Sequence, residues 1–194
     1  MKSRIKKITI IGTLTAMSAI LYLFPTFPIL PAFSWLEIDF ADIPALFASI
    51  LISPAAGAAV VLIRNTVHLT VSSTAMTGEL SNFLISALFV FAAGMFYRLF
   101  AKKNAAAGAG IRMKNVVCAL VLGTVCQVIT AMLVNYFIMI PLYSAFINFD
   151  ELGKAYYIFG GVLPFNIIKC TITSAVFAPV VRYAYPPIRR MLAE

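Results

Sequence analysis

Long apolar runs separated by short polar segments dominate this sequence. Most of the runs hold about 17–25 residues, the length at which a helix crosses the ~30 Å hydrocarbon core of a bilayer. The pattern therefore predicts an all-α integral membrane protein with a single membrane domain over residues 1–194. It predicts six transmembrane helices, with approximate bounds 8–24, 42–52, 55–71, 79–100, 115–141 and 162–183.

The second and third spans come from one apolar stretch, Ile43 to Leu69, which is interrupted at Ser53-Pro54. As one helix this stretch would be about 40 Å long, so a single tilted crossing is just possible. The basic residues favour two crossings, because Lys and Arg collect on the cytoplasmic side. The basic N-terminus and the basic segment 102–114 should both lie there. An even number of crossings must separate them, which makes the stretch a helical hairpin that turns at Pro54.

The same charge pattern predicts cytoplasmic N- and C-termini. Most of the 15 Lys and Arg residues fall at the predicted inner ends of the spans. Lys154 falls in an outer loop, while Arg64 and Lys169 fall inside spans. Two long outer segments follow from this topology: Pro25–Ala41, rich in proline and aromatic residues, and Tyr143–Gly161.

The composition agrees with a membrane protein, because 62% of the residues are hydrophobic and only 11% are charged. The net charge of +8 does not indicate nucleic-acid binding, since the basic residues form no face with interleaved aromatics. Cys118, Cys126 and Cys170 lie in apolar runs and are expected to be buried free thiols. No metal-ligand spacing, catalytic triad or Walker A motif is present, so we expect neither a metal site nor an enzyme.

Polar residues within membrane spans are costly and often functional. When the spans are oriented as above, most of these residues reach one depth, in the outer leaflet. Amides, one ammonium and one or two carboxylates would meet there among aromatic and aliphatic side chains. Such a pocket suits a neutral, flat ligand with hydrogen-bonding edges. The residues at this depth are Asp39, Asp42, Asn65, His68, Glu79, Asn82, Asn135, Asn166 and Lys169.

Structural roles are the alternative for several of these polar residues. Lys169 could form an ion pair with Glu79 and hold the bundle together, and Arg64 could pair with Asp42. Gln127, nearer the middle of its span, is expected to make an interhelical hydrogen bond.

Several motifs resemble, in the same order over nearly the whole chain, the substrate-binding S components of energy-coupling factor (ECF) transporters. The last two are most similar to the riboflavin-specific members. The matching stretches are Glu37–Leu46 (EIDFADIPAL), Ser53–Gly57 (SPAAG), Leu62–Leu69 (LIRNTVHL), Gly78–Phe83 (GELSNF), Asn135–Phe137 (NYF) and Leu163–Lys169 (LPFNIIK).

The resemblance implies a six-helix S component of the bacterial plasma membrane that binds riboflavin near its outer face and carries no cofactor. It also implies a transmembrane T component and two cytoplasmic ATPases as partners. The small residues Gly12, Ala16 and Ala19 would form the docking strip for these partners, or alternatively pack inside the protein. The candidate ligand-binding residues are Trp35, Leu36, Asp39, Asp42, Glu79, Asn82, Asn135, Tyr143, Asn166 and Lys169.

Two other functions remain open from the sequence. The chain could be an S component for another vitamin or flavin, such as FMN, thiamine or biotin. It could also be a small membrane protein with no role in transport.

Overall fold

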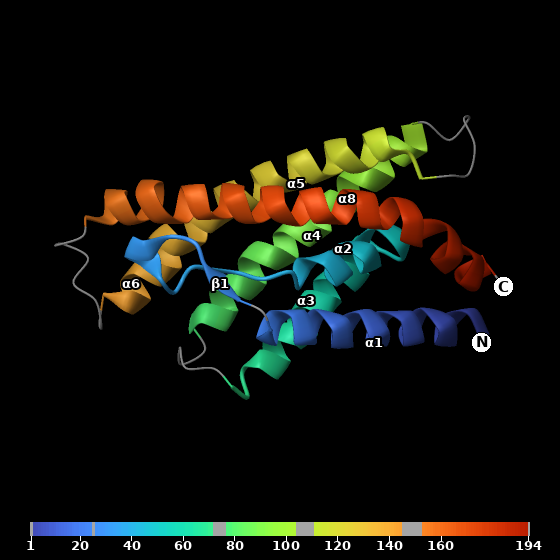
Figure 1. Ribbon diagram of the computed structural model, residues 1–194, viewed down its shortest axis with the longest axis horizontal. Coiled ribbons are helices and arrows are strands. Elements are labelled where there is room, and N and C mark those ends of the chain that lie inside the picture. Colours follow the sequence, from blue (N-terminus) through green and yellow to red (C-terminus); the bar gives the residue numbers. More distant parts are fainter. Residues whose placement is uncertain (1, 25, 72–76, 104–110, 145–152, 194) are drawn as a thin grey trace.

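The structure is a computed structural model, and it describes residues 2–24, 26–71, 77–103, 111–144 and 153–193. It is an elongated helical bundle in which both termini lie at one end (Figure 1). A short segment, with β1 (Phe27–Pro28), η1 (Pro31–Phe33) and β2 (Glu37–Ile38), lies nearer the other end. The helices are α1 (Lys2–Leu23), α2 (Asp42–Leu51), α3 (Pro54–His68), α4 (Thr77–Lys103), α5 (Met113–Val134), η3 (Asn135–Met139), α6 (Ile140–Tyr143), η4 (Tyr156–Val162) and α8 (Leu163–Ala193).

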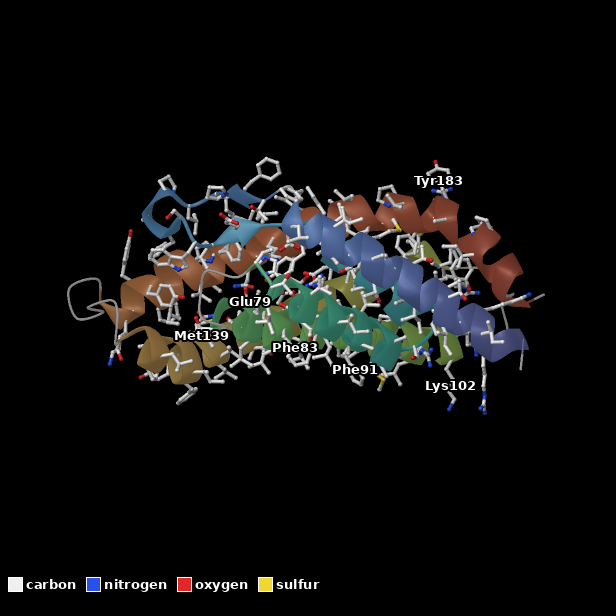
Figure 2. All side chains as sticks on the ribbon, turned by 90° about the horizontal axis from the view of Figure 1, so that it is seen from below. Glu79, Phe83, Phe91, Lys102, Met139 and Tyr183 are labelled. Atoms are coloured by element: carbon white, nitrogen blue, oxygen red, sulfur yellow. The ribbon has the colours of Figure 1, made fainter. Side chains whose placement is uncertain are left out.

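Four helical segments of the described residues are long and apolar enough to cross a membrane. A shorter apolar helix, α2, has 10 residues. In Figure 2, Glu79 near the start of α4 lies toward the middle of the bundle, and Lys102 near the end of α4 lies toward one end. The four segments are Arg4–Leu23, Thr77–Lys102, Met113–Leu142 and Tyr156–Ile188.

The predicted break at Ser53-Pro54 is confirmed. Helix α2 ends at Leu51 and α3 begins at Pro54, so the apolar stretch forms two helices. The Ser53 hydroxyl accepts a hydrogen bond from the Ala56 backbone N–H at 3.0 Å, which caps α3. Proline suits the first helical position because its missing N–H has no intrahelical acceptor there.

The sixth predicted helix, 162–183, is too short at both ends. Helical structure begins with the π-helical turn η4, inside the expected loop Tyr143–Gly161, and α8 continues to Ala193. The helix passes through Pro179, Pro186 and Pro187, and the last two lie beyond the predicted end of the span at residue 183. Proline within long membrane helices is tolerated, because neighbouring groups satisfy the freed backbone carbonyls.

The first outer segment is more ordered than a loop. Strands β1 and β2 pair antiparallel, with Phe27 opposite Ile38. This two-stranded ribbon adds a small β element to a fold that was predicted as all-α. The Phe33 side chain is almost fully buried and packs edge-on against the ring of Tyr157, which anchors the segment to η4.

The core has two parts. The larger cluster joins α2, α3, α4, α5 and α8 around Leu46, Val60, Phe89 and Phe177. The smaller lies below the ribbon, where Phe33 meets residues of η3 and η4. Many large apolar side chains outside both clusters are exposed, as expected where lipid replaces water around the helices.

The small-residue strip of α1 faces outward. Gly12 and Ala16 are exposed, and a Cβ added to Gly12 would meet no atom within 4 Å. Leu14 and Ser18, on the other side of α1, are buried. Packing inside the protein, the alternative considered from the sequence, is therefore wrong for Gly12 and Ala16, whereas Ala19 is partly buried.

The cysteines are all free, but they are not all buried. Cys170 is buried and Cys126 is partly exposed, whereas Cys118 is exposed on α5. The expectation of burial is wrong for Cys118, because a thiol behaves as a small hydrophobe that can also face lipid.

Candidate ligand-binding site

A cavity of about 120 Å³ lies between the ribbon segment and helices α4, α5 and α8. Polar groups from elements far apart in the sequence meet in it, together with aliphatic and aromatic walls. The lining residues are Trp35, Leu36, Glu37, Gly78, Ser81, Asn82, Ile85, Ser86, Gln127, Asn135, Tyr157, Val162, Phe165, Asn166 and Lys169.

Side-chain amides form one wall of the cavity. Gln127 Nε2 donates to Asn166 Oδ1 at 3.1 Å, and Asn166 Nδ2 donates to the Val162 carbonyl at 2.8 Å. This confirms the interhelical hydrogen bond expected of Gln127. Its Oε1 is buried and accepts no hydrogen bond from any described residue. An unpaired buried acceptor is costly, and a ligand N–H could satisfy it.

Asn135 reaches the same cavity from a π-helical turn. It is the first residue of η3, and its Nδ2 donates to the Ala131 carbonyl at 2.8 Å. The Tyr157 hydroxyl, from η4, donates to Asn135 Oδ1 at 2.8 Å. Two π-helical turns thus face each other across this hydrogen bond. Such turns occur often at functional sites because they reposition side chains within a helix.

Lys169 joins the cavity to the ribbon segment. Its Nζ is buried and lies 2.7 Å from Asp39 Oδ2, although the two residues are 130 positions apart in the chain. The partner suggested by the sequence, Glu79, instead lies 2.9 Å from His68 Nδ1. The ribbon carries Asp39 inward against α8, and no local pattern of the sequence predicts that contact.

Arg64 lies beneath the cavity and is fully buried. Its Nη2 donates to Asp42 Oδ1 at 2.6 Å and to Asn82 Oδ1 at 3.3 Å. Its Nη1 donates to the Ser18 hydroxyl at 3.4 Å, and the guanidinium carbon lies 5.4 Å from the centre of the Tyr22 ring. The expected pairing of Arg64 with Asp42 is confirmed.

The amide-lined cavity and its ion pairs can be compared with known families. The family model for the ECF transporter, substrate-specific component, matches residues 6–181. This chain belongs to that family. Membership in this family confirms the predicted S component. It excludes the hypothesis of a membrane protein with no role in transport, and it places the chain among transport components and not enzymes.

Individual relatives of this S component carry more specific names. The chain is 33% identical to the riboflavin transporter RibU of Streptococcus thermophilus, over 97% of this chain and 85% of that protein. It is 31% identical to the riboflavin transporter FmnP of Bacillus subtilis, over 90% of both chains. A solved structure reported as the S component of a bacterial ECF transporter superposes with a TM-score of 0.77 at 29% identity, covering 96% of this chain and 99% of that one.

The structure brings six of the ten candidate ligand-binding residues of this S component to the cavity. These are Trp35, Leu36, Asn82, Asn135, Asn166 and Lys169. The three acids Asp39, Asp42 and Glu79 lie behind the described lining residues, each paired with a basic side chain. The side chain of Tyr143 lies outside the described part of the structure.

Other lining residues were missed from the sequence. Ser81, Ile85 and Ser86 flank Asn82 on one face of α4, at the i, i+1, i+4, i+5 spacing of a helix. That spacing could have identified them. Tyr157 gave no such signal, because its segment was interpreted as a loop.

Metal binding finds no support in the part of the chain that the structure describes, because no three His, Cys, Asp or Glu side chains there lie close enough to hold an ion.

Proposed function

We propose that this S component binds riboflavin in the cavity between the ribbon segment and α4, α5 and α8. The single observation that carries the proposal is the set of polar groups around the cavity. Asn135 and Asn166 both donate and accept hydrogen bonds, and Lys169 donates. The edge of the isoalloxazine ring alternates carbonyl acceptors with an N–H, which the unpaired Gln127 Oε1 can accept. The names of the relatives agree with this ligand.

The charge of the cavity favours riboflavin over FMN. Lys169 is already neutralised by Asp39, and Glu37 adds a carboxylate to the lining. A phosphate ester brings negative charge that would call for several Arg or Lys residues. The ribityl hydroxyls of riboflavin can be satisfied by the hydroxyls of Ser81 and Ser86 instead.

Riboflavin entry requires part of the cavity wall to move. The cavity of about 120 Å³ is well below the roughly 300–1,000 Å³ of sites that enclose a small molecule. Trp35 and Leu36 form the lid in this proposal, because Trp35 is half-exposed and both lie in the short connection between η1 and β2. Asp39 positions Lys169 and ties this lid to α8.

For membrane topology, we infer six crossings with both termini in the cytoplasm of a bacterium. Helix α2 is about 15 Å long and α3 about 22 Å, both shorter than a ~30 Å core, so their two crossings would include non-helical residues at the helix ends. The hydrogen bond from Arg98 Nη2 to the Ile52 carbonyl supports a hairpin that turns near the inner end of α4. The T component and two ATPases would dock through the outward strip of Gly12, Ala16 and Ala19, and ATP hydrolysis would reorient the S component.

Riboflavin fluorescence tests the ligand directly. The ligand-free protein should quench riboflavin emission at one equivalent, whereas FMN, thiamine and biotin should compete poorly. Asn166→Leu and Lys169→Met should each weaken binding about 10- to 100-fold, the effect of losing a hydrogen bond to a polar or charged partner. Asn65→Leu is the matched control, because Asn65 is buried but does not line the cavity. A folded, ligand-free sample that does not quench riboflavin would refute the proposal.

A further inference from the structure

A second, larger depression lies on the outside of the bundle. Its volume is about 470 Å³, and none of its lining residues lines the amide cavity. One wall comes from the end of α5 and from η3, and the other from the start of the helical segment that contains η4. The lining residues are Met132, Leu133, Tyr136, Phe137, Lys154, Ala155, Ile158 and Phe159. We call this depression the outer groove.

The walls of the outer groove are apolar and open to the surroundings. Phe137 is 67% exposed and Phe159 61%, while Leu133 and Tyr136 are more than half exposed. Both walls belong to helical segments that are long and apolar enough to span a membrane. The ordinary neighbour of such a surface is therefore a lipid chain and not water.

The groove is held open by the helices behind it. The Tyr157–Asn135 hydrogen bond of 2.8 Å joins η4 to η3 on the buried side of the two turns. Ile158 is buried beside Tyr157 and closes the floor of the groove. A lipid chain would thus enter a preformed site. Binding there costs less entropy than binding to a site whose side chains must first be ordered.

Lys154 supplies a positive charge at the edge of the groove. It is exposed and is the cation among the described lining residues. Tyr136 supplies an amphipathic ring of the kind that gathers at the depth of lipid head groups. An ammonium beside an apolar channel is complementary to a phosphate ester with its acyl chain attached.

We propose that the outer groove binds one phospholipid molecule, with an acyl chain between the walls formed by Phe137 and Phe159 and its phosphate against Lys154. An anionic head group binds better than a zwitterionic one, because choline places a second cation near the lysine. The site shares no lining residue with the vitamin cavity and does not rest on the identity of the transported ligand.

Native mass spectrometry of the full chain in detergent tests this site. The protein is titrated with an equimolar mixture of phosphatidylglycerol and phosphatidylcholine of identical acyl chains. Wild type should retain one phosphatidylglycerol in preference to phosphatidylcholine. The wild-type preference should be about fivefold, the effect expected for one basic residue at an anionic lipid surface. Lys154→Gln should remove this preference. Ala155→Trp, which fills the groove, should abolish retention of both lipids.

Two matched controls separate this site from general lipid contact. Lys102→Gln removes an exposed lysine at the other end of the bundle, and Val125→Trp adds bulk to an exposed position of α5 outside the groove. Both should behave as wild type, and thermal unfolding should show that all four variants fold. The proposal fails if Ala155→Trp retains lipid like Val125→Trp, or if Lys154→Gln keeps the wild-type preference. It also fails if wild type is a dimer that Ala155→Trp dissociates without losing lipid.

Discussion

Among individual residues, Arg64 makes contacts that tie four helices together. From α3 it reaches Asp42 on α2, Asn82 on α4, and Ser18 and Tyr22 on α1. Removing one partner of a buried ion pair costs about 3–5 kcal/mol, because the remaining charge stays buried without compensation. Arg64→Met should therefore lower the thermal midpoint of the purified protein strongly, since the Asp42 carboxylate would lose its cation.

Arg64→Lys is the informative comparison for this prediction. Lysine keeps the charge but lacks the planar fork that contacts Asp42 and Ser18 together, so an intermediate midpoint is expected. Thermal unfolding followed by size-exclusion chromatography in one detergent measures all three proteins. Equal midpoints for Arg64→Met and wild type would show that the ion pair contributes nothing to stability.

Among the helices, α2 packs unusually close to α3 and α4. Ser49 of α2 donates to the Val90 carbonyl at 2.7 Å, and a Cβ at Gly94 would overlap the Ser49 hydroxyl. A Cβ at Gly57 would lie 2.5 Å from Ser49 Cβ. Small residues permit such close approach of membrane helices, and here they bring α2 and its Asp42 beneath the cavity.

Gly94→Ala should consequently destabilise the protein, by the roughly 1–3 kcal/mol that overpacking costs. Alanine is otherwise favoured over glycine within a helix by about 1 kcal/mol, so the sign of the effect is diagnostic. Gly12→Ala is the matched control, because its Cβ would meet nothing in the isolated chain. Thermal midpoints of the two variants should move in opposite directions, and a stabilised Gly94→Ala protein would contradict the close packing.

For the whole molecule, the arrangement of charge predicts its orientation in the membrane. The two termini lie at one end of the bundle, and the ribbon segment and η3 lie toward the other (Figure 1). In a variant without its three native cysteines, Glu37→Cys should react with a membrane-impermeant maleimide in intact cells. Lys102→Cys should react only after permeabilisation; both positions are exposed in the fold. The reverse labelling pattern would place the cavity on the cytoplasmic side.

The sequence by itself determined the features that depend on local physics. Apolar runs of membrane length predicted the four long helices, and Ser53 with Pro54 predicted where α2 and α3 separate, because capping depends on neighbouring residues. The motifs predicted the family, and six of the candidate residues line the cavity. The predicted end of the sixth span at residue 183 falls short of the end of α8, because this helix accommodates Pro186 and Pro187 and continues to Ala193.

Only the tertiary structure decided which polar groups meet. Lys169 is paired with Asp39, and Tyr157 with Asn135, because the ribbon and the two π-helical turns bring distant segments together. Ion pairs and hydrogen bonds act over a few ångströms, so their partners follow from how the chain folds back and not from spacing along it. The outer groove arises in the same way, from two helical turns that the sequence shows as a helix end and a loop.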